Sequence, residues 1–293
     1  MGIFANPLTD LLEYEDFSRD FLKGTDPVGM TGCIDSEKVH FMSTFLGEKK
    51  VQLVVTYNEQ RAREIEEDYK LFCSQVYVIP PRDLIFFSAD LQGNAIIAER
   101  MKAFAALYQN EAKVIITTID ALMSAAVPFE QLMSHVIKIK EGDELDLEKL
   151  KHDLTVMGYE RVGRVEEPGQ FTVHGGIADV YPLTMEVPVR IELWGDEIDT
   201  IRCFEPQSQR SMDQIESVSV FPAAEVIADD TARRRAVGMI QNELESQLAV
   251  FKKVKEPDKA KRLREETNRI LEALGEEVVL EAPDSYISYF YPR

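Results

Sequence analysis

The clearest chemistry in this sequence lies on a predicted strand that carries Arg190, Glu192 and Trp194. Residues two apart in a strand point to the same face, so these three side chains are expected to lie together. An arginine presents a planar, always charged fork of donors, and a tryptophan offers a large apolar surface; both are typical of residues that dominate protein interfaces. We therefore expect this face to be exposed.

Catalytic chemistry has weaker support. The carboxylates of Asp196, Glu197 and Asp199 lie close in sequence, but in a predicted hairpin they are expected to set the turn and solvate the strand. The chain has no Gly-x-Ser-x-Gly nucleophile elbow and no His-Glu-x-x-His zinc motif. Its 3 cysteines and 4 histidines show no metal-ligand spacing, so we expect no metal site.

One loop, Gly29-Met-Thr-Gly32-Cys-Ile34-Asp35-Ser36, invites comparison with a phosphate-binding loop. A working Walker A loop ends in Gly-Lys-Ser/Thr, where the lysine reaches the phosphates and the hydroxyl binds magnesium. Ile34 stands at the glycine position and adds a Cβ, and Asp35 stands at the lysine position and reverses the charge. By itself the segment is better explained as an ordinary strand-to-helix turn. It gains weight as a nucleotide loop only from the family resemblance described below, and it then predicts a degenerate, non-hydrolysing site.

Composition limits the classes of partner. The chain has 33 basic and 52 acidic residues, a net charge of −19, and nucleic-acid binding draws most of its affinity from neutralised phosphates. It is therefore expected to be a poor independent DNA binder. The sequence shows no secretory signal and no stretch of about 20 apolar residues. These features predict a cytoplasmic protein with reduced cysteines.

The elements that position these residues fall into three parts. Residues 1–127 alternate strands and helices, which predicts parallel strands at 51–57, 76–79 and 113–118, the first covered on both faces. Residues 128–222 hold a half-exposed strand, a helix at 146–157 ended by Gly158, and short antiparallel strands joined by Pro-Gly, Gly-Gly and Gly-Asp turns.

Residues 223–293 form the third part. They predict two long charged helices, at about 230–252 and 256–274, followed by a strand-like run at 278–280 and an aromatic tail.

The β-rich part resembles a known family. Its most specific stretch runs from Pro168 to Pro182, followed by the stretches Arg190–Arg202 and Ser208–Ser211. It is similar to the small domain shared by the excision-repair protein UvrB and the bacterial transcription-repair coupling factor, Mfd. The resemblance covers nearly the whole chain. It implies an α/β fold in which a RecA-like parallel-sheet domain (1–127) is split by an inserted β-rich α+β domain (128–222), with 223–293 as a helical return segment packing on the first part.

The resemblance also implies a recruitment role. In the family this domain binds the repair protein UvrA through an arginine before a strand turn, an arginine that begins the next strand, and an aromatic four residues later. The matching positions here are His174, Arg190 and Trp194. His174 departs from the pattern, because a neutral imidazole cannot reproduce the bidentate pairing of arginine.

The predicted function is thus a recruitment module of a coupling factor, which directs repair to a stalled RNA polymerase. The resemblance implies no catalysis and no cofactor in these residues. ATP, magnesium and the contacts to DNA and RNA polymerase would belong to parts of the full-length protein, an ATP-dependent DNA translocase, outside this chain.

Two other functions stay open. A UvrB-like, ATP-dependent damage-recognition protein would need an active loop at Gly29–Ser36 and a DNA-clamping hairpin, for which the connection Pro80–Gly93 is short. Direct DNA binding would rely on the arginines at 233–235 and the basic stretch 252–264, although acidic residues surround both.

Overall fold

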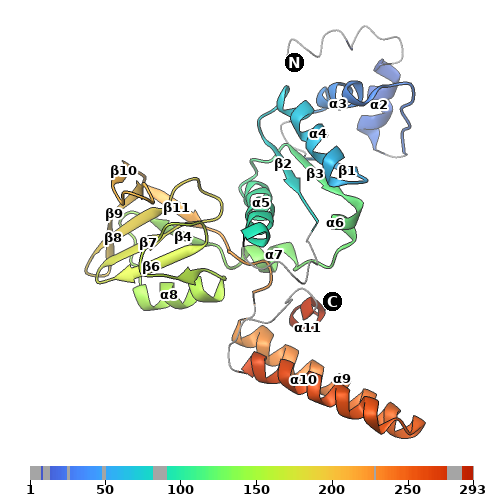
Figure 1. Ribbon diagram of the computed structural model, residues 1–293. Coiled ribbons are helices and arrows are strands. Elements are labelled where there is room, and N and C mark those ends of the chain that lie inside the picture. Colours follow the sequence, from blue (N-terminus) through green and yellow to red (C-terminus); the bar gives the residue numbers. More distant parts are fainter. Residues whose placement is uncertain are drawn as a thin grey trace. The chain divides into compact units, whose positions relative to one another are not determined.

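The computed structural model describes residues 8, 14–24, 27–47, 51–81, 91–227, 229–275 and 286–292 (Figure 1). The chain separates into two compact units, one of residues 1–82 with 102–124 and one of residues 83–101 with 125–293. A parallel sheet and antiparallel sheets are both present, so the predicted α/β class is confirmed. The predicted domain limits at 127 and 222 stay predictions. Across the described residues, no helix is long and apolar enough to cross a membrane.

A three-stranded parallel sheet in the order β1-β3-β2 forms the centre of the first unit. Its strands are β1 (Gln52–Thr56), β2 (Val76–Ile79) and β3 (Val114–Thr118). The central strand β3 is buried at every residue. The helices are α2 (Tyr14–Lys23), α3 (Asp35–Ser43), α4 (Glu59–Lys70), α5 (Leu91–Tyr108), which runs across both units, and α6 (Ile119–Met123). The predicted alternation of strands and helices is therefore confirmed.

The prediction that the first strand is covered on both faces was wrong. β1 lies at the edge of its sheet, with β3 as its neighbour. Val54 packs into the core formed with α4, whereas Leu53 is 59% exposed and Val55 is also exposed. A continuous apolar run does not distinguish a strand buried on both faces from an edge strand with one open face.

The second unit contains a six-stranded sheet in the order β10-β9-β8-β7-β6-β5 and a two-stranded sheet of β4 and β11. The strands are β4 (Ile137–Lys140), β5 (Glu160–Arg161), β6 (Gln170–His174), β7 (Ile177–Val180), β8 (Val189–Trp194), β9 (Glu197–Phe204), β10 (Ser211–Gln214) and β11 (Ser217–Val220). Helix α7 (Phe129–Met133) precedes β4, and helix α8 (Leu147–Val156) lies between β4 and β5. Neighbouring strands from β6 to β10 are antiparallel, as the turn residues predict.

One face of the six-stranded sheet forms the main core of this unit. Helix α8 contributes Leu150 and Leu154 to it, and the β4–β11 pair contributes Ile139 and Val220. The sheet contributes two rows of side chains, and each row runs across the neighbouring strands β6, β7, β8 and β9. One row is Phe171, Val180, Val189 and Cys203, and the other is Val173, Ala178, Ile191 and Ile201. Because side chains alternate along each strand, the residues between these rows point to the opposite face of the sheet.

Gly158 ends α8, as predicted from the sequence. Its φ is +89°, its N–H donates to the carbonyl of Thr155, and the N–H of Tyr159 donates to the carbonyl of Leu154. This pair of bonds is the Schellman motif, which needs a left-handed residue at this position. Tyr159 is then directed into the core, where its hydroxyl donates to the carbonyl of Phe221 at 2.7 Å and burial raises its pKa.

A helical segment completes the second unit. It consists of α9 (Asp230–Val254), α10 (Pro257–Gly275) and α11 (Ile287–Phe290). Figure 1 shows α9 and α10 as a side-by-side pair joined by a short turn, in orange and red. Ala236, Leu274 and Phe290 are buried between the three helices. The predicted strand at 278–280 lies outside the described residues.

Replacing Gly158 by alanine is expected to destabilise the β-rich part strongly. The left-handed φ is unfavourable for alanine by roughly 1–2 kcal/mol. The added Cβ would also lie 2.6 Å from the Cβ of Ala224, which forces a local displacement. Gly142→Ala is the matched control, because Gly142 also has a left-handed φ, +86°, but open space around its Cβ position. Hydrogen exchange of the β6–β8 amides should rise far more in Gly158→Ala; equal effects would show that the contact with Ala224 is unimportant.

Candidate functional site

The face of the six-stranded sheet opposite α8 carries all three residues predicted to bind a partner. Strand register places two rows there: Thr172, Asp179, Arg190 and Arg202 in one, and His174, Ile177, Glu192 and Thr200 in the other. Trp194 follows on β8 with the same alternation, opposite Glu197. The structure therefore brings His174, Arg190 and Trp194 to one face, and their part in binding stays a prediction. The two ends of this face differ.

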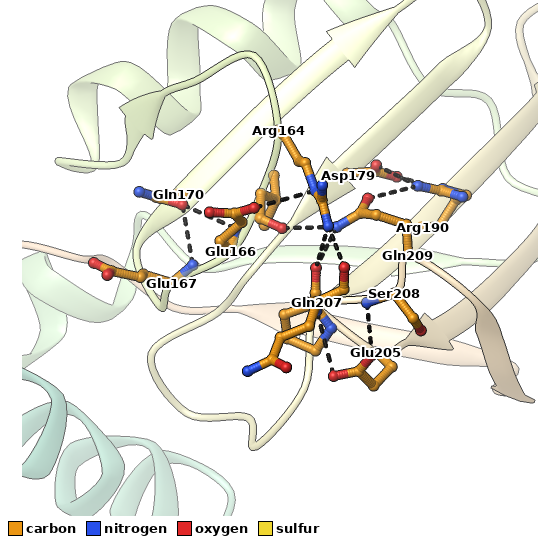
Figure 2. Close-up of polar contacts among 12 residues, drawn as sticks. Arg164, Glu166, Glu167, Gln170, Asp179, Arg190, Glu205, Gln207, Ser208 and Gln209 are labelled. Atoms are coloured by element: carbon orange, nitrogen blue, oxygen red, sulfur yellow. Dashed lines mark hydrogen bonds and ion pairs between the residues drawn. The ribbon is translucent and has the colours of Figure 1, made fainter.

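Arg190 lies at the closed end of the face, inside an ion pair (Figure 2). Its Nε and Nη2 donate to the two carboxylate oxygens of Asp179, each at 2.7 Å, and its guanidinium lies 4.8 Å from the ring centre of Phe204. The side chain of Arg190 is 22% exposed. The hydrogen bonds that Arg190 donates to Asp179 raise the pKa of Arg190, in opposition to desolvation. Such bidentate pairs are strong and geometrically fixed.

Two loops cover this end. Gln209, with a left-handed φ of +59°, donates from its amide to the carbonyls of Val165 and Pro206 and accepts from Arg190 at 3.4 Å. Arg164 donates to the carbonyl of Gln207 (Figure 2). Beneath these contacts, a small second core consists of Val165, Tyr181 and Phe204. Arg190 therefore helps to hold the domain together, in addition to any contact with a partner.

Sequence reasoning assigned no role to Asp179 or Gln209, although both lie in the motifs it singled out. The signal that could have identified Asp179 is its charge, since a carboxylate that becomes buried within a strand needs a cation nearby. No comparable signal exists for Gln209, because its contacts come from a loop that folds back over the sheet.

The other end of the face is open. Trp194 is 86% exposed and Ile177 is 41% exposed, and the side chain of His174 is exposed beside them in register. The His174 Nε2 lies 2.8 Å from Thr172 Oγ1, and Thr200 donates to Glu192 at 3.2 Å. An exposed tryptophan and an exposed isoleucine on the same face of a sheet offer apolar surface of the kind that marks a protein interaction site.

The hairpin that carries Trp194 is firmly anchored. A bulge between Glu192 and Leu193 skips Asp199 in the register, which returns Ile198 to the core face. The backbone of Ile198 exchanges two hydrogen bonds with Gly142 and Asp143, both at 2.9 Å, and Leu145 donates to the carbonyl of Asp196 at 2.8 Å. Trp194 is thus presented on rigid backbone, which reduces the entropy lost when a partner binds.

The surroundings of Trp194 are acidic. Asp196 lies in the turn that follows it, Glu197 begins β9 opposite it, and Glu144 pairs with Glu197 as an isolated bridge. Among the described residues, no group of three His, Cys, Asp or Glu side chains suits a metal ion. The arrangement offers an apolar anchor with a negative rim, which is chemistry for binding a protein surface.

The loop at Gly29–Ser36 lies in the first unit, at the start of α3. Gly32 has a φ of +82° and Ile34 directly precedes the helix. The Ile34 N–H donates to the carboxylate of Glu37 at 3.0 Å, so a carboxylate of the chain itself occupies this helix N-terminus, where a phosphate would otherwise bind.

Asp35 adds a second negative charge at the loop. Its carboxylate accepts from Lys38 at 3.1 Å and lies 3.5 Å from Arg61. The hydrogen bond from Lys38, then the charge of Arg61, lower the pKa of Asp35, so this group is anionic at neutral pH. Both nearby cations are therefore paired with Asp35, which makes this loop a poor host for a triphosphate.

Comparison with known proteins identifies the family. Residues 137–225 match the UvrB interaction domain. The transcription-repair-coupling factor of Bacillus subtilis is 30% identical over 294 residues, which cover 98% of this chain. Residues 137–225 are a UvrB interaction domain, in a chain homologous to transcription-repair coupling factors. The Staphylococcus haemolyticus protein of the same name is 33% identical over 231 residues, 78% of this chain.

The chain spans only part of these relatives. The matches cover 25% of the length of the Bacillus subtilis protein and 19% of the Staphylococcus haemolyticus protein. The match to the UvrB interaction domain runs from residue 137, at the start of β4, to residue 225, beyond the end of β11.

The exposure of Trp194 predicts its fluorescence behaviour. As the only tryptophan of the chain, it is expected to be quenched efficiently by neutral acrylamide. Iodide should quench less well and caesium better, because the carboxylates of Asp196 and Glu197 repel anions and attract cations. The difference between the two ions should shrink at high salt. A tryptophan shielded from acrylamide would contradict the open end of the face.

The occupied loop predicts weak or no nucleotide binding. Titration of the chain with a fluorescent ATP analogue and magnesium should give no saturable signal, because Asp35 and Glu37 repel phosphates. Competition with unlabelled ATP is the control for non-specific fluorescence. Saturable, micromolar binding that ATP displaces would show that the loop is functional.

Proposed function

We propose that this chain is a protein-recruitment module that binds the nucleotide-excision-repair protein UvrA. In the full-length coupling factor, this binding would direct repair to a stalled RNA polymerase in the cytoplasm. The single observation that carries the proposal is the exposed Trp194 on a rigid hairpin of a UvrB interaction domain.

Within this proposal, the open end of the face makes the contact and the closed end positions it. Trp194 and Ile177 supply the apolar anchor, and the carboxylates around them favour a basic rim on UvrA, which would speed association. Arg190 contacts UvrA at its exposed edge while its pair with Asp179 keeps β7 and β8 in place. His174 gives weaker contact than the arginine of the family.

The first unit is proposed to be an inactive RecA-like piece of the same protein, interrupted by the inserted β-rich domain. The parallel order β1-β3-β2 supports this. The loop at Gly29–Ser36, with Asp35 and Glu37 at the helix start, supports a chain without ATPase activity. ATP hydrolysis, magnesium binding, translocation on DNA and contact with RNA polymerase would reside in the other parts of the full-length protein.

The alternatives have less support. A UvrB-like damage-recognition ATPase requires nucleotide at a loop that carries two carboxylates. Direct DNA binding through the arginines at 233–235 conflicts with their contacts: Arg235 donates to the carbonyl of Phe290 and Arg234 to that of Asp230, each at 3.1 Å.

The test is calorimetric titration of this chain with UvrA from the same organism. Trp194→Ala is expected to weaken binding by about 2 kcal/mol, roughly thirtyfold, as for an interface anchor. The matched control is Tyr57→Ala, which removes an aromatic side chain that is 73% exposed in the first unit. His174→Arg is expected to strengthen binding, since it adds a charged donor fork.

Arg190 needs a more careful variant, because removing it leaves the buried Asp179 unpaired. Arg190→Lys keeps the charge and loses the fork, so a drop in thermal stability without a loss of UvrA affinity would show a purely structural role. Absence of binding by the parent chain, or equal binding by parent and Trp194→Ala, contradicts the proposed site.

A further inference from the structure

The turn between α9 and α10 forms a second surface with features of a binding site. A groove of about 850 Å³ lies there, and its lining includes Leu248, Phe251, Lys252, Lys255, Ala260 and Arg264. Leu248, Phe251 and Ala260 are partly buried and form an apolar floor, and Lys252, Lys255 and Arg264 are exposed along it. The lining also includes Lys261 and two carboxylates, Glu256 and Glu265. All residues that line the groove belong to the second unit, and none of them belongs to the sheet face that carries Trp194.

Charge is strongly concentrated at this turn. Residues 252–264 contain seven lysines or arginines and two acidic residues, from chain totals of 33 and 52. The remainder therefore holds 26 basic and 50 acidic residues, so a positive tip stands on a negative protein. Such a local reversal of sign favours acidic partners at this point.

Helix stability does not explain these charges. Lysines at the end of α9 suit the negative end of its dipole, but Lys259, Lys261, Arg262 and Arg264 lie in the first two turns of α10, where cations are unfavourable. Lys259 and Lys261 pair with Glu256 and Glu265 at 2.7 and 3.8 Å.

Three of the four cations that line the groove are unpaired in the described part of the chain; the fourth, Lys261, lies 3.8 Å from Glu265. Among the residues that the structure describes, Lys252, Lys255 and Arg264 have no ion-pair partner.

The turn holds its geometry through the backbone. Lys255 adopts a left-handed φ of +58°, and the N–H groups of Lys255 and Glu256 both donate to the carbonyl of Phe251. This C-cap fixes the backbone at the end of α9, so the turn that carries the apolar floor is preorganised.

We propose that this groove binds an acidic, amphipathic protein segment, in which apolar side chains enter between the helices and Asp or Glu side chains pair with Lys252, Lys255 and Arg264. The apolar floor distinguishes this ligand from nucleic acid, whose phosphate backbone uses cations but gains nothing from buried apolar surface. The acidic remainder of the chain also repels DNA.

The experiment uses the whole chain and fluorescein-labelled 15-residue peptides. The probe peptide carries Leu at helical i, i+3, i+4 spacing with Glu elsewhere; one comparison peptide replaces each Leu with Ser, and a labelled DNA duplex is the second comparison. Fluorescence anisotropy is expected to show salt-sensitive binding of the probe peptide, and weaker binding of the Ser peptide and of the duplex.

A matched pair of variants localises the binding. Lys252→Glu with Arg264→Glu reverses two charges that line the groove, and Lys253→Glu with Arg262→Glu reverses two exposed charges of the same helices outside it. Affinity is expected to fall more than about tenfold in the first variant and less than threefold in the second. Circular dichroism checks that both variants keep their helices.

Three results would overturn the proposal: no binding of the probe peptide, equal losses in both variants, or tighter binding of the duplex than of the peptide. None of these depends on UvrA, so this proposal and the proposed recruitment role can fail separately.

Discussion

The alternation of side chains along antiparallel strands is the constraint on which the UvrB interaction domain, residues 137–225, depends. Each strand of the six-stranded sheet sends alternate residues to opposite faces. One face is covered by α8 and the β4–β11 pair, so the side chains of the other face must find other contacts or stay exposed to solvent. The bulge at Asp199 adjusts this alternation where the sheet ends, and it keeps Ile198 in the core while the following turn projects outward. The position of Trp194 follows from this arrangement.

The second face is covered by loops at one end and exposed to solvent at the other. At one end, the pair of Arg190 and Asp179 is sheltered by loops that Gln209 and Arg164 hold in place. At the other end, no such cover lies over Trp194 and Ile177 in the described part of the chain. A rigid, half-covered face is suited to recognition, because the covered end preorganises the strands and the open end supplies the apolar anchor.

The loop at Gly29–Ser36, like the covered end of the sheet face, is held by contacts within the chain. Carboxylates of Glu37 and Asp35 occupy the helix start and the nearby cations, which are the groups that a phosphate would require. The chain therefore satisfies this helix N-terminus from within. The basic tip of the α9–α10 hairpin is the opposite case, since Lys252, Lys255 and Arg264 stay without such partners among the described residues.

The sequence by itself determined the order and type of most elements, from strands 76–79 and 114–118 to the cap at Gly158, because local periodicity and turn residues encode them. It also placed Arg190, Glu192 and Trp194 on one face, since strand parity is local information, whereas His174 was assigned only through the family resemblance. It missed the open face of β1, because exposure depends on which elements pack against a strand. Only the tertiary structure decided that Arg190 is held by Asp179 and Gln209 while Trp194 stays open. Those contacts join residues 11 and 19 positions apart, and their geometry is set by packing between strands and loops rather than by any local pattern.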